Sequence, residues 1–200
     1  MNRAWRRLLL DQSPTLAETV EARLGLEVRR LRESAGVSVR AFADRAGFSA
    51  SFISQLENGQ VSPSIASLGK IAAALNTTLA ELFARSSDNG VAVIRAKKRP
   101  SFRSSWSRAQ IAVLTAGFGA IEALMVTLEP GGLSGKEPSP SVHDQFGIVF
   151  SGALELTLGN ELLTLHRGDS VQIVARMPHR WHNASRRPAQ VALVSLRGGR

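Results

Sequence analysis

The 200-residue sequence contains no cysteine. Disulfide bonds and thiolate zinc sites are therefore excluded, and the absence fits a reducing compartment. No stretch approaches the roughly 18 consecutive apolar residues that a membrane span needs. The basic start of the chain leads into an apolar run that ends at Asp11, too early for the core of a signal peptide. We therefore expect a cytoplasmic protein with no membrane partner.

The motifs of several enzyme classes are missing as well. The sequence has no nucleophile-elbow motif and no spacing of serine and histidine that supports a catalytic triad. A glycine-rich loop that would cradle phosphate is also absent. These absences favour a binding protein over a hydrolase or a nucleotide-dependent enzyme.

The chain does carry an excess of positive charge, with a formal net charge of +9. Basic proteins attract polyanions such as nucleic acids. Residues 1–85 contain 11 Lys and Arg against 8 Asp and Glu, whereas residues 86–200 contain 14 against 8. Because the excess is larger in the second part, charge alone does not locate a nucleic-acid site, and a solvated basic surface is an equal alternative.

The composition changes near residues 86–90, which divides the chain into two parts. Before this point apolar residues recur at helical spacing, and after it short β-rich runs are separated by Gly and Pro. This pattern predicts an α+β two-domain protein with an N-terminal five-helix all-α domain and a C-terminal all-β domain. The expected boundaries are 1–85 for the helical domain (core 24–83), 86–110 for the linker and first strand, and 111–200 for the β domain.

The helices and strands can be placed from periodicity and capping residues. A first helix carries the stripe from Leu16 to Leu31, and the others cover 38–46, 49–58, a stretch after Ser64, and 79–83. Strands are expected at 91–95, 111–115, 121–128, 145–150, 154–158, 162–165, 171–174 and 190–196.

The second and third helices are joined by a tight turn that predicts a DNA-binding element. Gly47 supplies the positive φ that such a turn needs. Ile53 and Leu56 are expected to anchor the third helix from below. The outer face of that helix, near its N-terminus, is then exposed to solvent. It can enter the major groove of DNA, which is about 12 Å wide.

Residues 37–83 resemble the phage-repressor-like, xenobiotic-response-element family of helix-turn-helix domains. The resemblance is carried by the stretch 47–59, followed by Pro63-Ser64, Leu68 and the run 70–75. It implies binding to double-stranded DNA, with Ala50, Ser51 and Gln55 at base-contacting positions. The rest of the predicted DNA-binding set is Arg40, Ser49, Asn58, Ser62, Ser64 and Lys70, of which Asn58 falls at a phosphate-contacting position.

Three further positions bear on this resemblance. Arg32 and Glu57 stand where the family often has an internal ion pair, and we expect that pair to be structural. Val39 stands where the family usually has glutamine, so the polar contact of that position is lost here. Arg40 is then expected to supply a phosphate contact instead, unless the affinity for DNA is simply lower.

Residues 91–197 resemble the small cupin barrel, a double-stranded β-helix. The resemblance rests on 129–132, 145–152, 165–169 and 178–183. Metal-binding cupins have two histidines, a glutamate and a later histidine. Here Gln145 stands at the position of the glutamate. The positions of the two histidines fall within 138–141, which contains no metal-ligating residue. Only His179 matches, at the position of the later histidine. We therefore predict no metal and no cofactor, and expect an effector pocket lined by His143, Gln145, His179 and Trp181. A weak metal site formed by His143, Gln145 and His179 remains the alternative.

The resemblances together imply a transcriptional regulator, not an enzyme. A single helix-turn-helix domain, which we call the head, makes few contacts with DNA. We therefore expect a homodimer that binds two half-sites about one turn of DNA apart. The cupin barrel is expected to bind a small-molecule effector, to dimerise, or both. The alternative is a metal-dependent cupin enzyme, a dioxygenase or isomerase, fused to a DNA-binding head.

Overall fold

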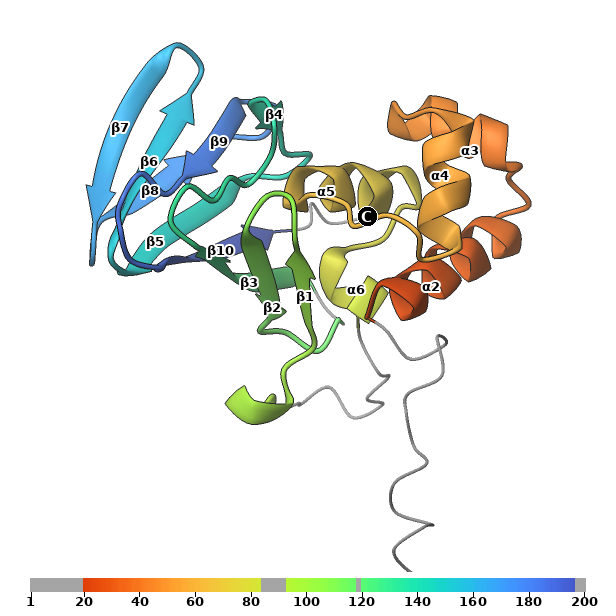
Figure 1. Cartoon of the computed structure of the whole chain (residues 1–200), viewed down its shortest axis with the longest axis horizontal. Coiled ribbons are helices and arrows are strands. Elements are labelled where there is room, and N and C mark those ends of the chain that lie inside the picture. The colour runs from red at the N-terminus through yellow and green to blue at the C-terminus, as the bar shows by residue number, and fades with distance from the viewer. Residues whose placement is uncertain (1–19, 84–92, 118–119, 197–200) are drawn as a thin grey trace, which may run out of the picture.

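The computed structural model describes residues 20–83, 93–117 and 120–196 of the chain, whose helices and strands form two regions (Figure 1). The helices gather at one end of the molecule and most of the strands at the other, with helix α5 lying between them. The predicted α+β fold with a helical domain and an all-β domain is confirmed. Among the described helices, none is both long enough and apolar enough to cross a bilayer.

Five α-helices lie within residues 20–83: α2 (Val20–Ser34), α3 (Val39–Ala46), α4 (Ala50–Glu57), α5 (Ile65–Ala74) and α6 (Leu79–Phe83). The hydroxyls of Ser38, Ser49 and Ser64 cap three of them, each accepting a hydrogen bond from the backbone N–H three residues later. Helix α3 ends at Gly47, whose left-handed conformation (φ 73°) suits a residue without Cβ. The predicted start of the first helix, at 13–19, lies outside the described residues.

The β region consists of two antiparallel sheets. The strands are β1 (Ser101–Ser104), β2 (Ala109–Val113), β3 (Ile121–Leu128), β4 (Ser139–Pro140), β5 (Gln145–Ser151), β6 (Ala153–Leu158), β7 (Glu161–His166), β8 (Ser170–Ile173), β9 (Pro178–His182) and β10 (Ala189–Leu196). One sheet has the order β1-β2-β3-β10-β5-β8 and the other the order β4-β9-β6-β7. Apolar side chains from both sheets, with Trp181 among them, form a buried core between them.

The sequence placed most strands correctly but missed or misplaced some. Residues 93–95 of the run expected at 91–95 are not a strand; they lead into the 3₁₀ turn η2 (Ala96–Lys98), and 91–92 lie outside the described residues. The short strands β1 and β4 were not expected. Strand β9 was missed because it begins with Pro178 and carries three polar side chains, so it lacks the apolar run that marks a strand.

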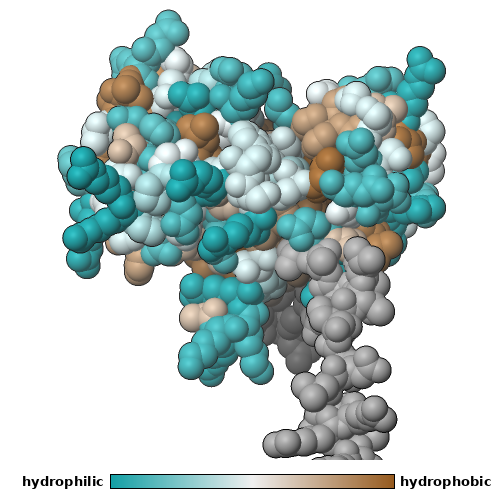
Figure 2. All heavy atoms as spheres, in the orientation of Figure 1, coloured by the Kyte–Doolittle hydropathy of each residue, from teal (hydrophilic) through white to brown (hydrophobic). Residues whose placement is uncertain are grey.

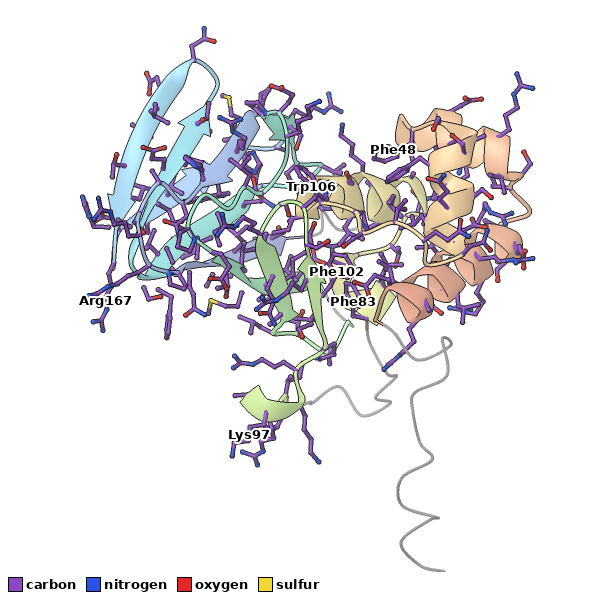
Figure 3. All side chains as sticks on the ribbon, viewed as in Figure 1. Phe48, Phe83, Lys97, Phe102, Trp106 and Arg167 are labelled. Atoms are coloured by element: carbon purple, nitrogen blue, oxygen red, sulfur yellow. The ribbon has the colours of Figure 1, made fainter. Side chains whose placement is uncertain are left out.

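The helical domain and the β region share one hydrophobic core. Buried side chains of the helices cluster with Phe102, Ile111, Val113 and Leu124 from strands β1, β2 and β3. The rings of Phe83 and Phe102 stack at this junction, with centroids 6.3 Å apart (Figure 3). The helical head is therefore packed onto the end of the β region rather than tethered to it by a linker alone.

Candidate nucleic-acid interface and interdomain cavity

Helix α4 presents a polar face to solvent on a buried apolar base. Ile53 and Leu56 are 0% and 1% exposed and pack into the head. The predicted base-contacting residues Ala50, Ser51 and Gln55 are all exposed, as is Asn58 just beyond the helix. The structure therefore brings these predicted residues together on one accessible surface, which we call the α4 surface.

The N-terminus of α4 is held in a defined conformation. The Ser49 hydroxyl accepts a hydrogen bond from the Phe52 backbone N–H and lies 3.0 Å from the Ser51 hydroxyl. The rings of Phe48 and Phe52 stack with centroids 4.7 Å apart, and Figure 2 shows apolar surface over this part of the head. Because the cap uses only one of the first N–H groups, the others remain available to an anion such as phosphate.

A buried ion pair fixes the other end of α4. The Arg32 guanidinium on α2 donates two hydrogen bonds to the Glu57 carboxylate, at 2.6 Å and 2.9 Å, and a third to the backbone carbonyl of Val37. The hydrogen bond to Glu57 raises the pKa of Arg32 above its ordinary value. The predicted structural pair is confirmed, and it connects α2, α4 and the start of the α3 region.

Close backbone contact also determines how α2 crosses α4. A Cβ added to Gly25 of α2 would lie 2.4 Å from the Leu56 carbonyl oxygen and 2.8 Å from that of Glu57. Only a residue without a side chain allows the two helices to approach this closely. Sequence spacing does not reveal this contact, because Gly25 fits the pattern of an ordinary helix.

Helix α3 carries the departure from the family pattern. Val39 is half-buried and packs against the core of the head. Its neighbour Arg40 is exposed on the outside of the helix. The apolar residue thus contributes to packing, and the guanidinium beside it remains free to reach a phosphate.

The remaining DNA-binding candidates lie in different surroundings. Ser64 is only 3% exposed, and its hydroxyl caps α5 and lies 2.9 Å from the Ser67 hydroxyl, so it is not accessible to a phosphate. Ser62 is half-buried, and its hydroxyl lies 3.5 Å from the carbonyl oxygen of Arg103 in the β region. Lys70 is exposed on α5, where it faces two hollows between the domains.

The basic turn η2 lies far from the α4 surface. Lys97 projects at the opposite side of the molecule from Phe48, which stands at the start of α4 (Figure 3). All three residues of this turn are exposed. Its charge therefore does not extend the α4 surface within one chain.

A cavity of about 210 Å³ lies between α5 and the β region. All four residues predicted to line an effector pocket, His143, Gln145, His179 and Trp181, line this one cavity. The opposite wall comes from the helical domain, which sequence reasoning missed. The head residues that line it are Ile65, Ala66, Gly69, Lys70, Ala72, Ala73, Thr77, Thr78 and Leu79.

Two buried polar atoms of the cavity residues lack hydrogen-bond partners among the described residues. The indole Nε1 of Trp181 and the amide Oε1 of Gln145 are buried without a hydrogen bond. The amide nitrogen of Gln145 donates to the Ser195 hydroxyl at 3.3 Å. Buried polar groups without partners are rare in proteins, and one explanation is a ligand that supplies the missing bonds.

His179 is held in one tautomer. Its Nδ1 lies 2.9 Å from the backbone carbonyl of Met177, and because a carbonyl only accepts, Nδ1 carries the proton. Burial lowers the pKa of His179 below its ordinary value of 6.5, which favours the neutral ring. Nε2 is then a hydrogen-bond acceptor.

The cavity residues do not fit the metal centre of metal-binding cupins. Across residues 20–83, 93–117 and 120–196, no three His, Asp or Glu side chains are arranged to hold an ion. Gln145 stands in place of the carboxylate, and its amide is bonded to Ser195. His182 is turned to the Glu155 carboxylate, 2.8 Å away, and is a structural residue.

Comparisons with known proteins agree with this architecture. The sequence pattern of the helix-turn-helix domain family matches residues 23–84, and that of the cupin domain family matches residues 124–195. The HTH-type transcriptional regulator SutR of Escherichia coli (strain K12) is 24% identical over 165 residues, covering 80% of this chain and 86% of SutR. The HTH-type transcriptional regulator PuuR of the same organism is 26% identical over 163 residues, covering 80% of this chain and 88% of PuuR.

A solved structure has the same overall fold. The HTH_3 family transcriptional regulator from Vibrio cholerae superimposes with a TM-score of 0.68 at 20% sequence identity. The match covers 90% of this chain and 98% of that one. The arrangement of a helical head followed by a β domain is therefore common to both molecules.

Proposed function

Because this chain belongs to the helix-turn-helix proteins that carry a C-terminal cupin domain, we propose that it is a cytoplasmic transcriptional regulator that binds specific sequences of double-stranded DNA. The observation that carries the proposal is the α4 surface: an exposed helix face on a helix fixed by a cap, a buried ion pair and close backbone packing. A helix held this rigidly can enter the major groove without an ordering cost.

The chemistry of the α4 surface assigns separate roles to its residues. The Gln55 amide can bond bidentately to adenine, the Ser51 hydroxyl can bond to several bases, and the Ala50 methyl suits a thymine methyl. Arg40 and Asn58, which flank this set, are placed to contact phosphates and to fix the orientation of the head. Ser49 contributes by capping the helix.

We further propose that the protein acts as a homodimer. The outer face of the six-stranded sheet carries apolar side chains on adjacent strands; we call it the outer sheet face. Its residues are Ile121, Ala123 and Met125 on β3, Ala192, Val194 and Leu196 on β10, and Phe146, Ile148 and Phe150 on β5. A large exposed apolar patch marks an interaction site, and pairing with the same face of a second copy would give the two-fold symmetry of a palindromic site.

The cavity between the domains is proposed to bind a small effector rather than to catalyse a reaction. It combines a few polar groups with apolar walls, as ligand sites do. Its residues do not fit a metal centre, which disfavours a metal-dependent cupin enzyme. A bound effector would change operator affinity to the extent that it favours one placement of the heads over another.

The test is selection of binding sites from random DNA with the full chain. We expect one enriched palindromic sequence. Its affinity for the protein should be at least 10³-fold higher than that of random DNA at physiological salt. Gln55→Ala should relax the preference at one base pair, by a factor that corresponds to about 1–3 kcal/mol. Asn160→Ala, which removes an exposed amide from the turn between β6 and β7, is the control and should leave the preference unchanged. Affinity without sequence preference would contradict the proposal.

A further inference from the structure

We infer that the ligand of the interdomain cavity is a small hydroxylated acid, whose anionic group is held by Lys70 of the DNA-binding head while its hydroxyls bond to the cupin wall. The inference rests on the proposed function and specifies both the chemical class of the effector and the way it reaches the DNA-binding domain. It follows from the hydrogen-bonding groups on the two walls of the cavity.

The cupin wall presents both donors and acceptors. The buried Trp181 Nε1–H is a donor without a partner, and the buried Gln145 Oε1 is an acceptor without one. The Nε2 of His179 is a second acceptor, because its Nδ1 proton is committed to the Met177 carbonyl. Hydroxyl groups both donate and accept, so a ligand with neighbouring hydroxyls offers partners of both kinds to this wall. The Trp181 and Gln145 atoms are closed to solvent, so their side chains must shift for the ligand to reach them.

The helical wall supplies the charge. Lys70 is the only Lys or Arg among the residues described as lining the cavity, and its ammonium has no ion-pair partner among the described residues. The Glu122 carboxylate also lines the cavity, where it accepts a hydrogen bond from the Ala80 backbone N–H. Lys70 is the cationic group of this lining, and its ammonium can bind a carboxylate or a phosphate at the side of the cavity that α5 forms.

The size of the cavity limits the ligand further. Its volume of about 210 Å³ is below the range of roughly 300–1,000 Å³ that holds drug-sized ligands. A compound of a few carbons fits better than a nucleotide or a fatty acid. Gly69, on the helical wall, leaves open space: a Cβ built there meets no atom within 4 Å.

Hydrogen bonds connect the cavity directly to the DNA-binding head. The backbone N–H of Trp181 donates to the Ser134 hydroxyl, and the Ser134 N–H donates to the Trp181 carbonyl. The Ser134 carbonyl in turn accepts from the N–H of Ala66 in the first turn of α5. A ligand held by Lys70 and Trp181 would bridge the same two elements, and would thus fix α5 and the packed head against the barrel.

The test uses the full chain and four six-carbon probes. Gluconate carries hydroxyls and a carboxylate, sorbitol only hydroxyls, hexanoate only a carboxylate, and glucosamine carries hydroxyls with an amine. Shorter hydroxy acids, glycerate and threonate, and glucose 6-phosphate extend the acid series and separate carboxylate from phosphate. Isothermal titration calorimetry should show that at least one hydroxylated acid binds. That acid should bind at least tenfold more tightly than the compound without hydroxyls, the uncharged compound and the amine.

Variants of the head then identify the site. Lys70→Met should weaken binding about tenfold to a hundredfold, the value of one charge-assisted hydrogen bond. Gly69→Leu should abolish binding by filling the cavity from α5. Lys98→Met, an exposed lysine on η2, is the matched control and should bind as the unmodified protein does. Thermal unfolding of each variant without ligand should give a cooperative transition, which checks that the variant folds.

The same preparation is then tested on the selected operator. The ligand should change operator affinity by about 5-fold to 150-fold, and the operator should change ligand affinity by the same factor. Specific operator binding with no hydroxylated acid preferred over its counterparts, or with binding unaffected by Lys70→Met and Gly69→Leu, overturns this inference and leaves the regulator standing. Loss of sequence-specific DNA binding itself overturns the proposed function.

Discussion

The Arg32–Glu57 pair is the residue contact on which the position of helix α4 depends most. Both side chains are almost fully buried, and the carboxylate accepts two hydrogen bonds from the guanidinium. Removing one partner leaves a buried charge without compensation, so Glu57→Ala should lower the free energy of unfolding by about 3–5 kcal/mol. The measurement is urea unfolding followed by circular dichroism.

Two variants make this prediction specific. The double variant Arg32→Met with Glu57→Leu removes both charges and should recover most of the lost stability. Arg29→Ala breaks the exposed pair Arg29–Glu33, in which both side chains are about half exposed, and should lower the free energy of unfolding far less than Glu57→Ala does. Equal losses for Glu57→Ala and Arg29→Ala would show that the buried pair has no special weight.

His179 should make the stability of the protein depend on pH. Burial lowers the pKa of His179 below the 6.5 of the unfolded chain. As the pH falls below about 6.5, the unfolded chain takes up a proton that the folded chain does not, so stability decreases until the pH reaches the lower, folded pKa. Above pH 6.5 the residue contributes no pH dependence.

Thermal unfolding at several values between pH 8 and pH 5 measures this effect. The unmodified protein should lose more stability on acidification than His179→Gln, in which that titration is absent and all other groups are the same. Parallel curves for the two proteins would contradict a lowered pKa at this residue.

At the scale of elements, the crossing of α2 and α4 depends on Gly25. An added methyl group would collide with the carbonyl oxygens of Leu56 and Glu57, which belong to the backbone and cannot turn away. Gly25→Ala should therefore destabilise the head by about 1–3 kcal/mol, despite the better helix propensity of alanine. DNA binding should fall as well, because the collision shifts α4.

Gly69→Ala is the matched substitution in another helix. Its Cβ meets open space, so helix propensity alone should act and stabilise the protein by about 0.5–1 kcal/mol. Urea unfolding of the two variants compares them directly. The crossing would not need a glycine if Gly25→Ala were as stable as Gly69→Ala.

The elements show which parts of the fold the sequence determines locally. The five helices were predicted because serine caps and three- and four-residue spacing are local signals. The contacts of α5 were not, since its spacing shows one buried face but not that Gly69 and Lys70 face a barrel formed by residues far along the chain. For the same reason the sequence predicts Ser64 and Lys70 as DNA-binding residues, although Ser64 is a buried cap and Lys70 faces the interdomain cavity.

The cavity, too, could be predicted from the sequence only in part. Gln145, His179 and Trp181 were predicted from their places in cupin motifs and His143 from its position two residues before Gln145, and all four line one cavity. What they contact remains a prediction. The helical wall could not be predicted, because it depends on how two domains pack, and packing between distant segments leaves no periodic signal in either one.

At the scale of the whole molecule, the outer sheet face should determine both assembly and DNA binding. Phe146 and Phe150 on β5 are 46% and 61% exposed and lie beside the apolar residues of β10. Phe150→Lys would bury an ammonium without a partner in the proposed dimer, which costs several kcal/mol and should yield monomers. Light scattering after size-exclusion chromatography gives the mass.

DNA binding provides the second readout of the same variant. A monomer presents one head, so Phe150→Lys should bind a palindromic operator at least tenfold more weakly, with little change in affinity for an isolated half-site. Leu162→Lys, on β7 of the other sheet, replaces an apolar residue that is 64% exposed and should remain dimeric with full affinity. If Phe150→Lys remained a dimer while Leu162→Lys became a monomer, the contact between subunits would lie on the four-stranded sheet, and the two heads would be placed on a different two-fold axis from the one proposed here.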